Sequence, residues 1–143
     1  MLGANVLIAL AIIGGLLFST TQGVAQDAKE IEKVCAQAEE RYRKMDIDKN
    51  TDDNTVVALM YKYTFCPPEL KIKAGTTVRW INVDKRTSHS VWFKAAGKPE
   101  SERLFPEEFT KTTFAEPGVY PYVCGPHGEQ EKMIGTITVV AKP

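Results

Sequence analysis

The chain has 143 residues, of which 18 are basic and 18 acidic, so its formal net charge is zero. This balance leaves no global basic field that would attract nucleic acid or anionic lipid, and nucleic acid is therefore excluded as an expected partner. Without a leader of about 25 residues, the chain would still be long enough for one domain with a hydrophobic core.

Residues 1–25 are typical of a secretory leader. Residues 6–18 form a compact apolar run, and Gly23 and Ala25 are small residues at the −3 and −1 positions of a cleavage site before Gln26. We therefore expect a signal peptide and export to the periplasm, with no membrane span once the leader is cleaved. No basic residue precedes the apolar run, so an uncleaved N-terminal membrane anchor is the alternative. The run is shorter than the roughly 20 residues that a membrane-spanning helix needs.

Residues 27–45 are the best helix candidate. Asp27 followed by Glu30 resembles a capping box at the start of a helix. Apolar residues recur at helical spacing on one face, namely Ile31, Val34, Cys35, Ala38, Tyr42 and Met45. The pattern favours a helix that packs across one sheet or edge of the domain. The alternative is a docking or dimerisation element.

Residues 46–54, DIDKNTDDN, are polar and complete a helix-and-linker unit over residues 26–54. Their start resembles a calcium-binding loop. However, Thr51 stands where such a loop has Gly, and Val57 stands where it has Glu. We therefore interpret this segment as a solvated linker and not as a calcium site.

From Thr55 onward the pattern is one of short strands separated by turn residues. Residues 56–65 are rich in β-branched and aromatic side chains, and Leu70 and Ile72 alternate with charged residues, as in a strand with one wet face. Several such strands at regular intervals predict an all-β sandwich domain over residues 55–143.

Two later segments bear on how the strands connect. Residues 94–109 are polar and acidic, which predicts a long surface crossover with at most a short helix. In the strand-like run of residues 120–124, Pro121 lacks an amide donor. This indicates either an edge strand or a local break, and the sequence leaves the choice open.

Residues 120–140, YPYVCGPHGEQEKMIGTITVV, contain the side chains with metal-binding chemistry. Cys124, His127 and Met133 lie in one loop between two strand-like runs, and His89 ends another such run. Two imidazoles, a thiolate and an axial thioether are the donor set of a mononuclear blue-copper site, because Cys and Met favour copper over hard ions. The chain has only two histidines, and both belong to this set. The alternative axial donors are Glu129, Gln130 and Glu131.

Four segments, in this order, resemble the cupredoxins, with the plastocyanin, pseudoazurin and amicyanin branch as the nearest pattern. They are FCPPELKIKAGTTVRWIN, SHSVWF, FAEPGVYPYVCGPH and MIGTITV. The resemblance implies a Greek-key β-sandwich with a metal held by loops at one end, to which this chain adds an N-terminal α-helix. It also implies one type 1 copper ion, with His89, Cys124 and His127 as equatorial ligands and Met133 as the axial ligand.

Three positions depart from the family pattern. Five residues lie between His127 and Met133, one or more beyond the expected number. Ser90 follows His89 where the family usually has Asn, and Gly125 follows Cys124 where it usually has Ser or Thr. That Asn and that hydroxyl normally tie the two ligand loops together, so their absence predicts a weaker tie in this chain.

The chain has three cysteines. If Cys124 binds copper, Cys35 and Cys66 remain, and paired cysteines of exported proteins usually form a bridge. Such a disulfide would attach the N-terminal helix to the first strands of the sandwich. Two separate thiols are the alternative, because the sequence does not give the geometry that a bridge requires.

The donor set and the resemblance together predict an electron carrier and not an enzyme. If protein donors fill every coordination position, none is left open for catalysis. We therefore expect a periplasmic carrier of single electrons between redox partners, such as a c-type cytochrome and a copper enzyme. One alternative is a copper chaperone or copper-tolerance protein. Another is a docking module whose helix matters more than its metal.

Overall fold

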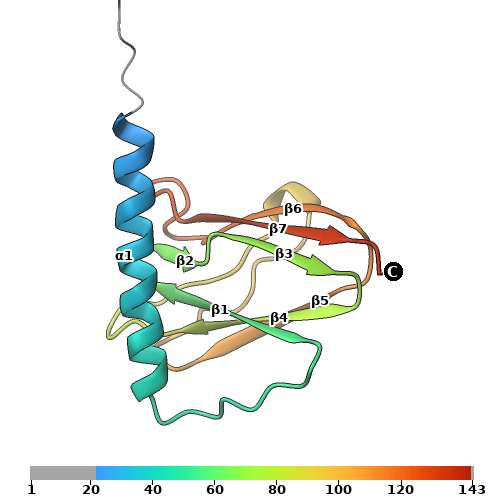
Figure 1. Ribbon diagram of the computed structural model, residues 1–143, viewed down its shortest axis with the longest axis horizontal. Coiled ribbons are helices and arrows are strands. Elements are labelled where there is room, and N and C mark those ends of the chain that lie inside the picture. Colours follow the sequence, from blue (N-terminus) through green and yellow to red (C-terminus); the bar gives the residue numbers. More distant parts are fainter. Residues whose placement is uncertain (1–21, 143) are drawn as a thin grey trace, which may run out of the picture.

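The computed structural model describes residues 22–142, in which seven strands form two sheets and α1 lies outside them (Figure 1). The elements are α1 (Gln22–Lys44), β1 (Thr55–Tyr61), β2 (Thr64–Cys66), β3 (Glu69–Lys73), β4 (Thr76–Asn82), the 3-10 helix η1 (Lys94–Ala96), β5 (Phe109–Phe114), β6 (Gly118–Val123) and β7 (Ile134–Val140). The expected leader, residues 1–25, lies outside the described part except for its last four residues, which belong to α1. No helix within residues 22–142 has both the length and the apolarity of a membrane span.

Both sheets are mixed. One has the strand order β2-β1-β4-β5 and the other β3-β7-β6. The pairs β1–β4 and β3–β7 are parallel, whereas the other neighbours are antiparallel. The predicted all-β sandwich with an added N-terminal helix is confirmed. Because β6 is an edge strand, the edge position is the correct alternative for Pro121.

A central cluster of buried side chains fills the space between the sheets. Its aromatic members meet edge to face or tilted, with ring centroids 5.5 Å apart for Trp80 and Tyr122 and 4.6 Å apart for Phe65 and Tyr122. Tyr122 pairs with Gly135 across β6 and β7, and a Cβ at that glycine would lie 2.4 Å from the tyrosine ring. Only glycine therefore leaves room for the ring at this position. The same cluster includes Cys124, which connects the core to the metal-binding end.

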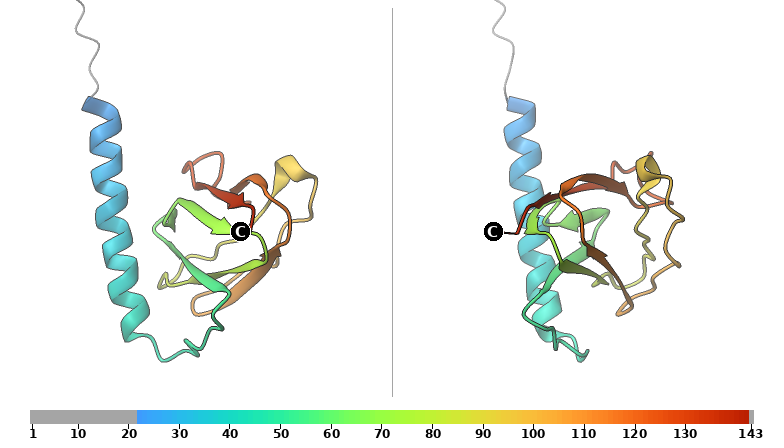
Figure 2. Two further views of the ribbon diagram at one scale, coloured as in Figure 1. Left: turned by 45° about the vertical axis from the view of Figure 1, so that its right-hand side comes forward. Right: turned by 90° about the vertical axis from the view of Figure 1, so that its right-hand side faces the viewer.

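Helix α1 lies outside the sandwich and packs against β1 and β2, and Ile81 of β4 joins the same buried cluster (Figures 1 and 2). The predicted start at Asp27 is wrong, since the helix already begins at Gln22. Residues such as Ala25 and Gln26 favour helices, so Asp27 lies inside the helix and does not cap it. Ile31 was predicted on the packed face but is 36% exposed.

The packed face of α1 forms what we call the helix-side cluster. Its buried members are Val34, Ala38, Leu59, Cys66, Ile81 and Val83. The predicted disulfide is confirmed, with Cys35 and Cys66 joined across a Cα–Cα distance of 5.2 Å. At the other end of the contact, the Arg41 side chain donates a 2.6 Å hydrogen bond to the carbonyl of Val83. The helix therefore packs across one sheet of the domain, as the sequence pattern favoured.

The segment predicted as one strand-like run, residues 56–65, forms the hairpin of β1 and β2. Its turn residues, Lys62 and Tyr63, have φ angles of 46° and 58°. Two successive left-handed residues are the signature of a type I′ hairpin turn, which usually contains Asn and Gly. The absence of those residues explains why the sequence did not predict the turn. The hairpin places Tyr63 at its tip.

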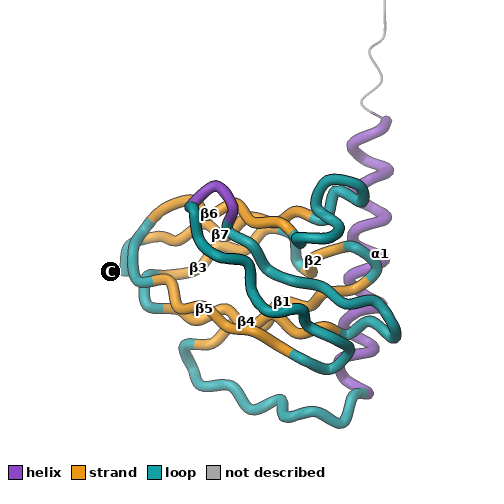
Figure 3. Tube along the Cα trace, turned by 180° about the vertical axis from the view of Figure 1, so that it is seen from behind, coloured by secondary structure: helices purple, strands orange, loops and turns teal. Residues whose placement is uncertain are grey.

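The connection between β4 and β5, residues 83–108, contains η1 and crosses in front of the strands in Figure 3. Isolated bridges attach it at two places, from His89 to Leu104 within the connection and from Trp92 to Val123 at the end of β6. Leu104 is only 5% exposed, so the crossover contributes to the core as well as to the surface. These attachments fix the loop on which His89 lies.

Candidate metal centre

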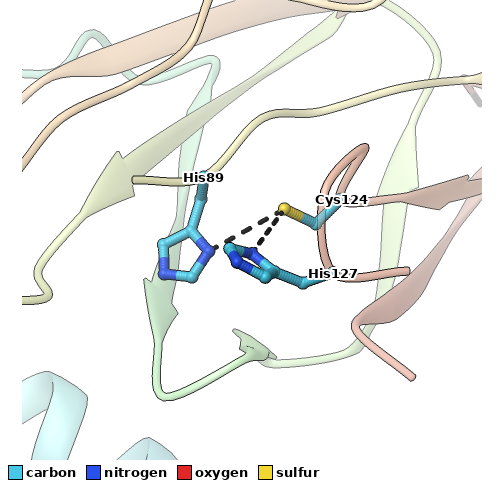
Figure 4. Close-up of side chains that lie close together, drawn as sticks. All are labelled: His89, Cys124 and His127. Carbon is cyan, nitrogen blue, oxygen red and sulfur yellow. Dashed lines mark hydrogen bonds between the residues drawn. The ribbon is translucent and has the colours of Figure 1, made fainter. Parts of the chain in front are cut away.

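The donor atoms of His89, Cys124 and His127 converge at one end of the sandwich (Figure 4). Cys124 Sγ lies 3.8 Å from His89 Nδ1 and 3.4 Å from His127 Nδ1. All three donor atoms lie within 4.8 Å of one another. The side chains of His89 and Cys124 are fully buried, whereas His127 is partly exposed. The structure thus brings together the three residues predicted as equatorial ligands.

The loop that presents His89 is held from inside by the buried side chain of Asn82. Its Oδ1 accepts a 2.9 Å bond from the amide of Asp84, and its Nδ2 donates to the carbonyls of Thr87 and Leu104. His89 and Leu104 also exchange two backbone hydrogen bonds, at 3.0 and 2.8 Å. The backbone of His89 is therefore fixed on both sides of its strand-like segment.

Asp84 orients the imidazole ring of His89. Its Oδ2 lies 2.9 Å from His89 Nε2 and accepts a second 2.9 Å bond from the backbone amide of Lys62. Because Nε2 is engaged in this way, Nδ1 is the nitrogen that faces Cys124. Burial opposes the charged imidazolium, but the hydrogen bonds to Asp84 and Cys124 outweigh it and raise the pKa of His89.

A single tight turn presents Cys124 and His127 on the same side. The carbonyl of Cys124 accepts bonds from the amides of His127, at 3.3 Å, and Gly128, at 2.7 Å. A Cβ at Gly128 would lie 2.8 Å from that same carbonyl, so a larger residue would force the turn open. The spacing of two residues between cysteine and histidine therefore matches one turn of backbone, which explains why the motif is informative in the sequence.

The thiol of Cys124 is poised for ionisation. Burial opposes the thiolate, but hydrogen bonds from His89 and from the backbone amide of Ser90 together lower the pKa of Cys124. For His127, burial and the nearby charges of His89 and Arg103 lower the pKa of the imidazole. A thiolate and a neutral imidazole are the forms in which these side chains bind metals.

Met133 is fully buried in the central cluster that also contains Cys124. Its carbonyl accepts a 3.0 Å bond from the amide of Cys124, which places Met133 opposite the cysteine at the start of β7. The extra loop length between His127 and Met133 bulges outward. All three alternative axial donors are exposed on that bulge, namely Glu129, Gln130 and Glu131.

The two ligand loops are tied together although the family's Asn and hydroxyl-bearing residue are both absent. The hydroxyl of Ser90 accepts a 2.9 Å hydrogen bond from the amide of Gly125, and the amide of Ser90 lies 3.4 Å from Cys124 Sγ. The loops are therefore joined at two points, although neither family residue is present. The hydroxyl now stands on the loop of His89 and the backbone amide on the loop of Cys124.

Sequence reasoning missed Asn82, Asp84 and Tyr63. The Tyr63 ring lies edge to face against both histidines, with its centroid 4.9 Å from that of His127 and 6.3 Å from that of His89. Asp84 precedes His89 by five residues in an irregular connection, where spacing alone does not predict a contact. Tyr63 gave no signal, because its contact depends on the unpredicted hairpin turn.

The residues present fit a copper ion. Two imidazole nitrogens and one thiolate form a borderline-to-soft donor set of the kind that copper prefers. A carboxylate ligand would favour a hard cation, but within the part of the chain that the structure describes no carboxylate joins this cluster. The carboxylate of Asp84 faces the outer nitrogen of His89 and not the three donor atoms.

Comparison with protein families agrees with this chemistry. Residues 52–140 match the model described as copper binding proteins, plastocyanin/azurin family. The chain is 31% identical to amicyanin of Paracoccus versutus over 123 residues, which cover 83% of this chain and 86% of that protein. It is 37% identical to amicyanin of Paracoccus denitrificans over 79 residues, which cover 52% of this chain but only 60% of that protein.

Solved structures show the same likeness. An oxidised variant of amicyanin superposes with a TM-score of 0.57 at 32% identity, covering 66% of this chain and 90% of the other. A reduced variant gives a TM-score of 0.56 at 30% identity, with 64% and 87% covered. The matched portion leaves over a third of this chain outside the superposition.

Proposed function

Because the chain belongs to the plastocyanin/azurin family of copper-binding proteins, we propose that it carries single electrons between redox proteins through one type 1 copper ion. The observation that supports this most directly is the convergence of His89 Nδ1, Cys124 Sγ and His127 Nδ1 within 4.8 Å. These three atoms would hold the ion as equatorial ligands. Met133 would supply the axial thioether, since it is the buried candidate and the loop alternatives are exposed.

Bound copper would supply a one-electron couple between its cupric and cuprous states. The protein's part is to keep the donors in one arrangement, and the hydrogen bonds of Asn82, Asp84 and Ser90 do so from three directions. Little rearrangement is then needed when the charge of the site changes. With four protein donors no coordination position is left for a substrate, so the site supports a carrier and not an enzyme.

His127 is the proposed point of electron entry and exit, because it is the partly exposed member of the set. Tyr63 contacts it and is itself 40% exposed. Exposed Glu131 and Lys132 lie on the same loop, and Lys94 pairs with Glu129 at 3.8 Å. A docking partner such as a c-type cytochrome or a copper enzyme would meet this charged rim, so its association should weaken as salt is added.

The proposed location is the periplasm, reached through the leader predicted in residues 1–25. The Cys35–Cys66 disulfide supports this, because stable bridges are typical of exported proteins and rare in reducing compartments. Expression of the full gene followed by N-terminal sequencing of the periplasmic product tests the idea. A mature chain beginning at Gln26 supports it. A protein retained with residues 1–25 in the membrane fraction supports the anchored alternative.

The decisive experiment on function is voltammetry of the copper-loaded full chain, paired with a copper-transfer assay. We expect one reversible one-electron wave and negligible loss of Cu(I) to a chelator of moderate affinity. Glu102→Ala, an exposed position on the crossover, serves as the control that leaves all proposed ligands and their hydrogen bonds in place. Ready transfer of Cu(I) without a reversible wave would instead identify a copper chaperone.

A further inference from the structure

We propose that Glu100 is a positioning residue for the copper site. Its carboxylate takes the space that a side chain at position 125 would need and, through the hydroxyl of Ser90, fixes the loop that presents Cys124. This inference rests on the proposed function, since it concerns the loop proposed to hold copper. It assigns a role to a residue that the sequence places in an acidic surface crossover.

The first observation is a chain of short contacts through Ser90. Its hydroxyl donates a 2.5 Å hydrogen bond to Glu100 Oε1 and accepts the 2.9 Å bond from the amide of Gly125. Its own amide points to Cys124 Sγ at 3.4 Å. One residue thus contacts the thiol, the next peptide of the thiol loop, and the carboxylate of the crossover.

The second observation is the fit between Glu100 and Gly125. A Cβ built on Gly125 would lie 2.0 Å from Glu100 Oε1 and 2.4 Å from Glu100 Cδ. Gly125 is not among the residues with positive φ, so backbone conformation does not require glycine there. The preference for glycine follows from space, because a side chain there would have to displace the Glu100 carboxylate. The carboxylate occupies the position where the Ser or Thr of the family pattern would begin.

The chemistry of the carboxylate explains why it suits this position. A hydroxyl can donate in one direction and accept in others, so alone it does not select the amide of Gly125. An ionised carboxylate only accepts, and it draws the hydroxyl hydrogen of Ser90 toward itself in a strong, charge-assisted bond. The oxygen lone pairs of Ser90 are then free to face the amide of Gly125. Glu100 therefore makes the Ser90 hydroxyl the acceptor of the hydrogen bond from the Gly125 amide.

The crossover is built to deliver Glu100 to this place. The amide of Ser101 donates to the carbonyl of Val91 at 3.0 Å, and the amide of Val91 donates to the hydroxyl of Ser101 at 2.9 Å. These two bonds pair the residues that follow Glu100 and Ser90. Although the Glu100 residue is exposed overall, its backbone neighbours hold it beside the ligand loops.

The first test compares Glu100→Ala, Glu100→Gln and the control Glu102→Ala, whose carboxylate is exposed and forms no hydrogen bond or ion pair with the ligand loops in the described structure. In the copper-free full chain, Glu100→Ala should speed hydrogen exchange of the Gly125 amide roughly fivefold, the size expected for one lost hydrogen bond. Glu100→Gln keeps an acceptor oxygen and should restore most of the protection. The proposal is overturned if the Gly125 amide exchanges equally fast in the Ala and Gln variants, or if its exchange in Glu100→Ala is no faster than in the native chain.

The copper-loaded variants provide a readout that a purely structural role would not change. Glu100→Ala should shift the reduction potential and the thiolate-to-copper absorption band relative to Glu100→Gln, because both variants remove the charge and only one removes the acceptor. Copper affinity should fall by about tenfold in the Ala variant, at the low end for residues that support metal ligands. Identical potentials and spectra in the two variants count against positioning.

The second test is a double-mutant cycle with Gly125→Ala. In the native background the new methyl group should displace the carboxylate and cause the same loss of Gly125-loop protection as Glu100→Ala. In the Glu100→Ala background it should cause almost no further change, so the two effects should be strongly non-additive. Simple additivity overturns the proposal. Because the cycle uses copper-free protein, it tests the positioning role of Glu100 independently of electron transfer. Non-additive effects would support that role even if voltammetry ruled out an electron carrier, and additive effects would reject it even if voltammetry showed a reversible wave.

Discussion

The helix-side cluster and the metal centre are stabilised by different kinds of interaction. On the helix side, apolar side chains such as Val34 and Leu59 are buried together, and the Cys35–Cys66 disulfide joins the two layers covalently. At the metal centre, all three predicted equatorial donors lie outside the named strands, and hydrogen bonds with Asp84 and Ser90 position His89 and Cys124.

This difference shows how the sandwich divides its tasks. Apolar packing tolerates small shifts of side chains, whereas a metal donor displaced by a fraction of an ångström changes the properties of the ion. We therefore expect the helix side to set the free energy of unfolding and the metal end to set the spectrum and potential. Substitutions in the two regions should act almost additively where the altered side chains share no partner.

The largest expected effect is at the metal end. Replacing Cys124 with Ser should abolish the intense thiolate-to-copper absorption band, because no other thiol is free to donate to the site. The copper-free variant should keep its circular dichroism spectrum and its disulfide, since the helix side does not depend on this atom. Absorption spectroscopy after copper addition measures the effect. A band of undiminished intensity would show that another sulfur ligand operates.

The second effect is at the helix side. Replacing both Cys35 and Cys66 with Ser should lower the free energy of unfolding of the full chain by about 3–4 kcal/mol, the chain-entropy value for a loop of this length. The sequence separation of the two cysteines is 31 residues. Denaturant titration gives the free energy, and the copper absorption band of the folded variant should be unchanged. A changed band would show that the helix side also affects the geometry of the metal centre.

The third effect lies in the core that the two regions share. Burial raises the pKa of Tyr122 to about 12, against an ordinary value of 10.0. Below the unfolded pKa, Tyr122 is neutral in both the folded and the unfolded states, so its ionisation takes nothing from the free energy of unfolding. That free energy falls as the pH rises from about 10 to 12, where the unfolded state loses the proton first. The expected loss is roughly 2–3 kcal/mol.

Tyr122→Phe sharpens this test. Its hydroxyl has no hydrogen-bond partner within residues 22–142, so its removal should leave stability at neutral pH nearly unchanged. The variant should lose less stability between pH 10 and pH 12 than the native chain. Denaturation midpoints followed against pH provide the comparison. Parallel curves for the two proteins would mean that other groups cause the alkaline loss.

The smallest expected effect concerns the axial position. Met133→Gln should lower the reduction potential, because an oxygen donor stabilises Cu(I) less well than a thioether does. Copper should remain bound by the three equatorial donors. Gln130→Ala and Glu131→Ala are the matched controls, and both should leave the potential unchanged because these side chains are exposed. A shift in either control, with none in Met133→Gln, would move the axial role to the loop.

The sequence predicted best what depends on local spacing. Cys124 and His127 lie within one turn of backbone, and their spacing alone placed both donors together. The pairing of Cys35 with Cys66 was predicted because Cys124, the third cysteine, was assigned to copper, and the structure confirms the disulfide. The family resemblance then supplied the long-range partner, His89.

The contacts that position the donors were not predictable, because they depend on long-range placement. Glu100 appeared to be one of several acidic surface residues, and only its position beside Ser90 gives it a role. Tyr63 reaches the histidines from a hairpin turn that lacks the usual Asn and Gly. The start of α1 was misplaced because Asp27 matches a capping pattern that a continuing helix overrides.

The position of Pro121 on the edge strand β6 has a consequence for the behaviour of this protein at high concentration. The amide of Val123 points away from β7 and bonds the carbonyl of Trp92, so by alternation the missing donor of Pro121 faces the same open edge. An open edge with a continuous row of amides is a template on which a second chain can add as a strand and begin to polymerise. In β6 the row is blocked at Val123 and interrupted at Pro121. The crossover segment at Trp92 and the missing amide of Pro121 together leave little of the β6 edge on which a second chain could add.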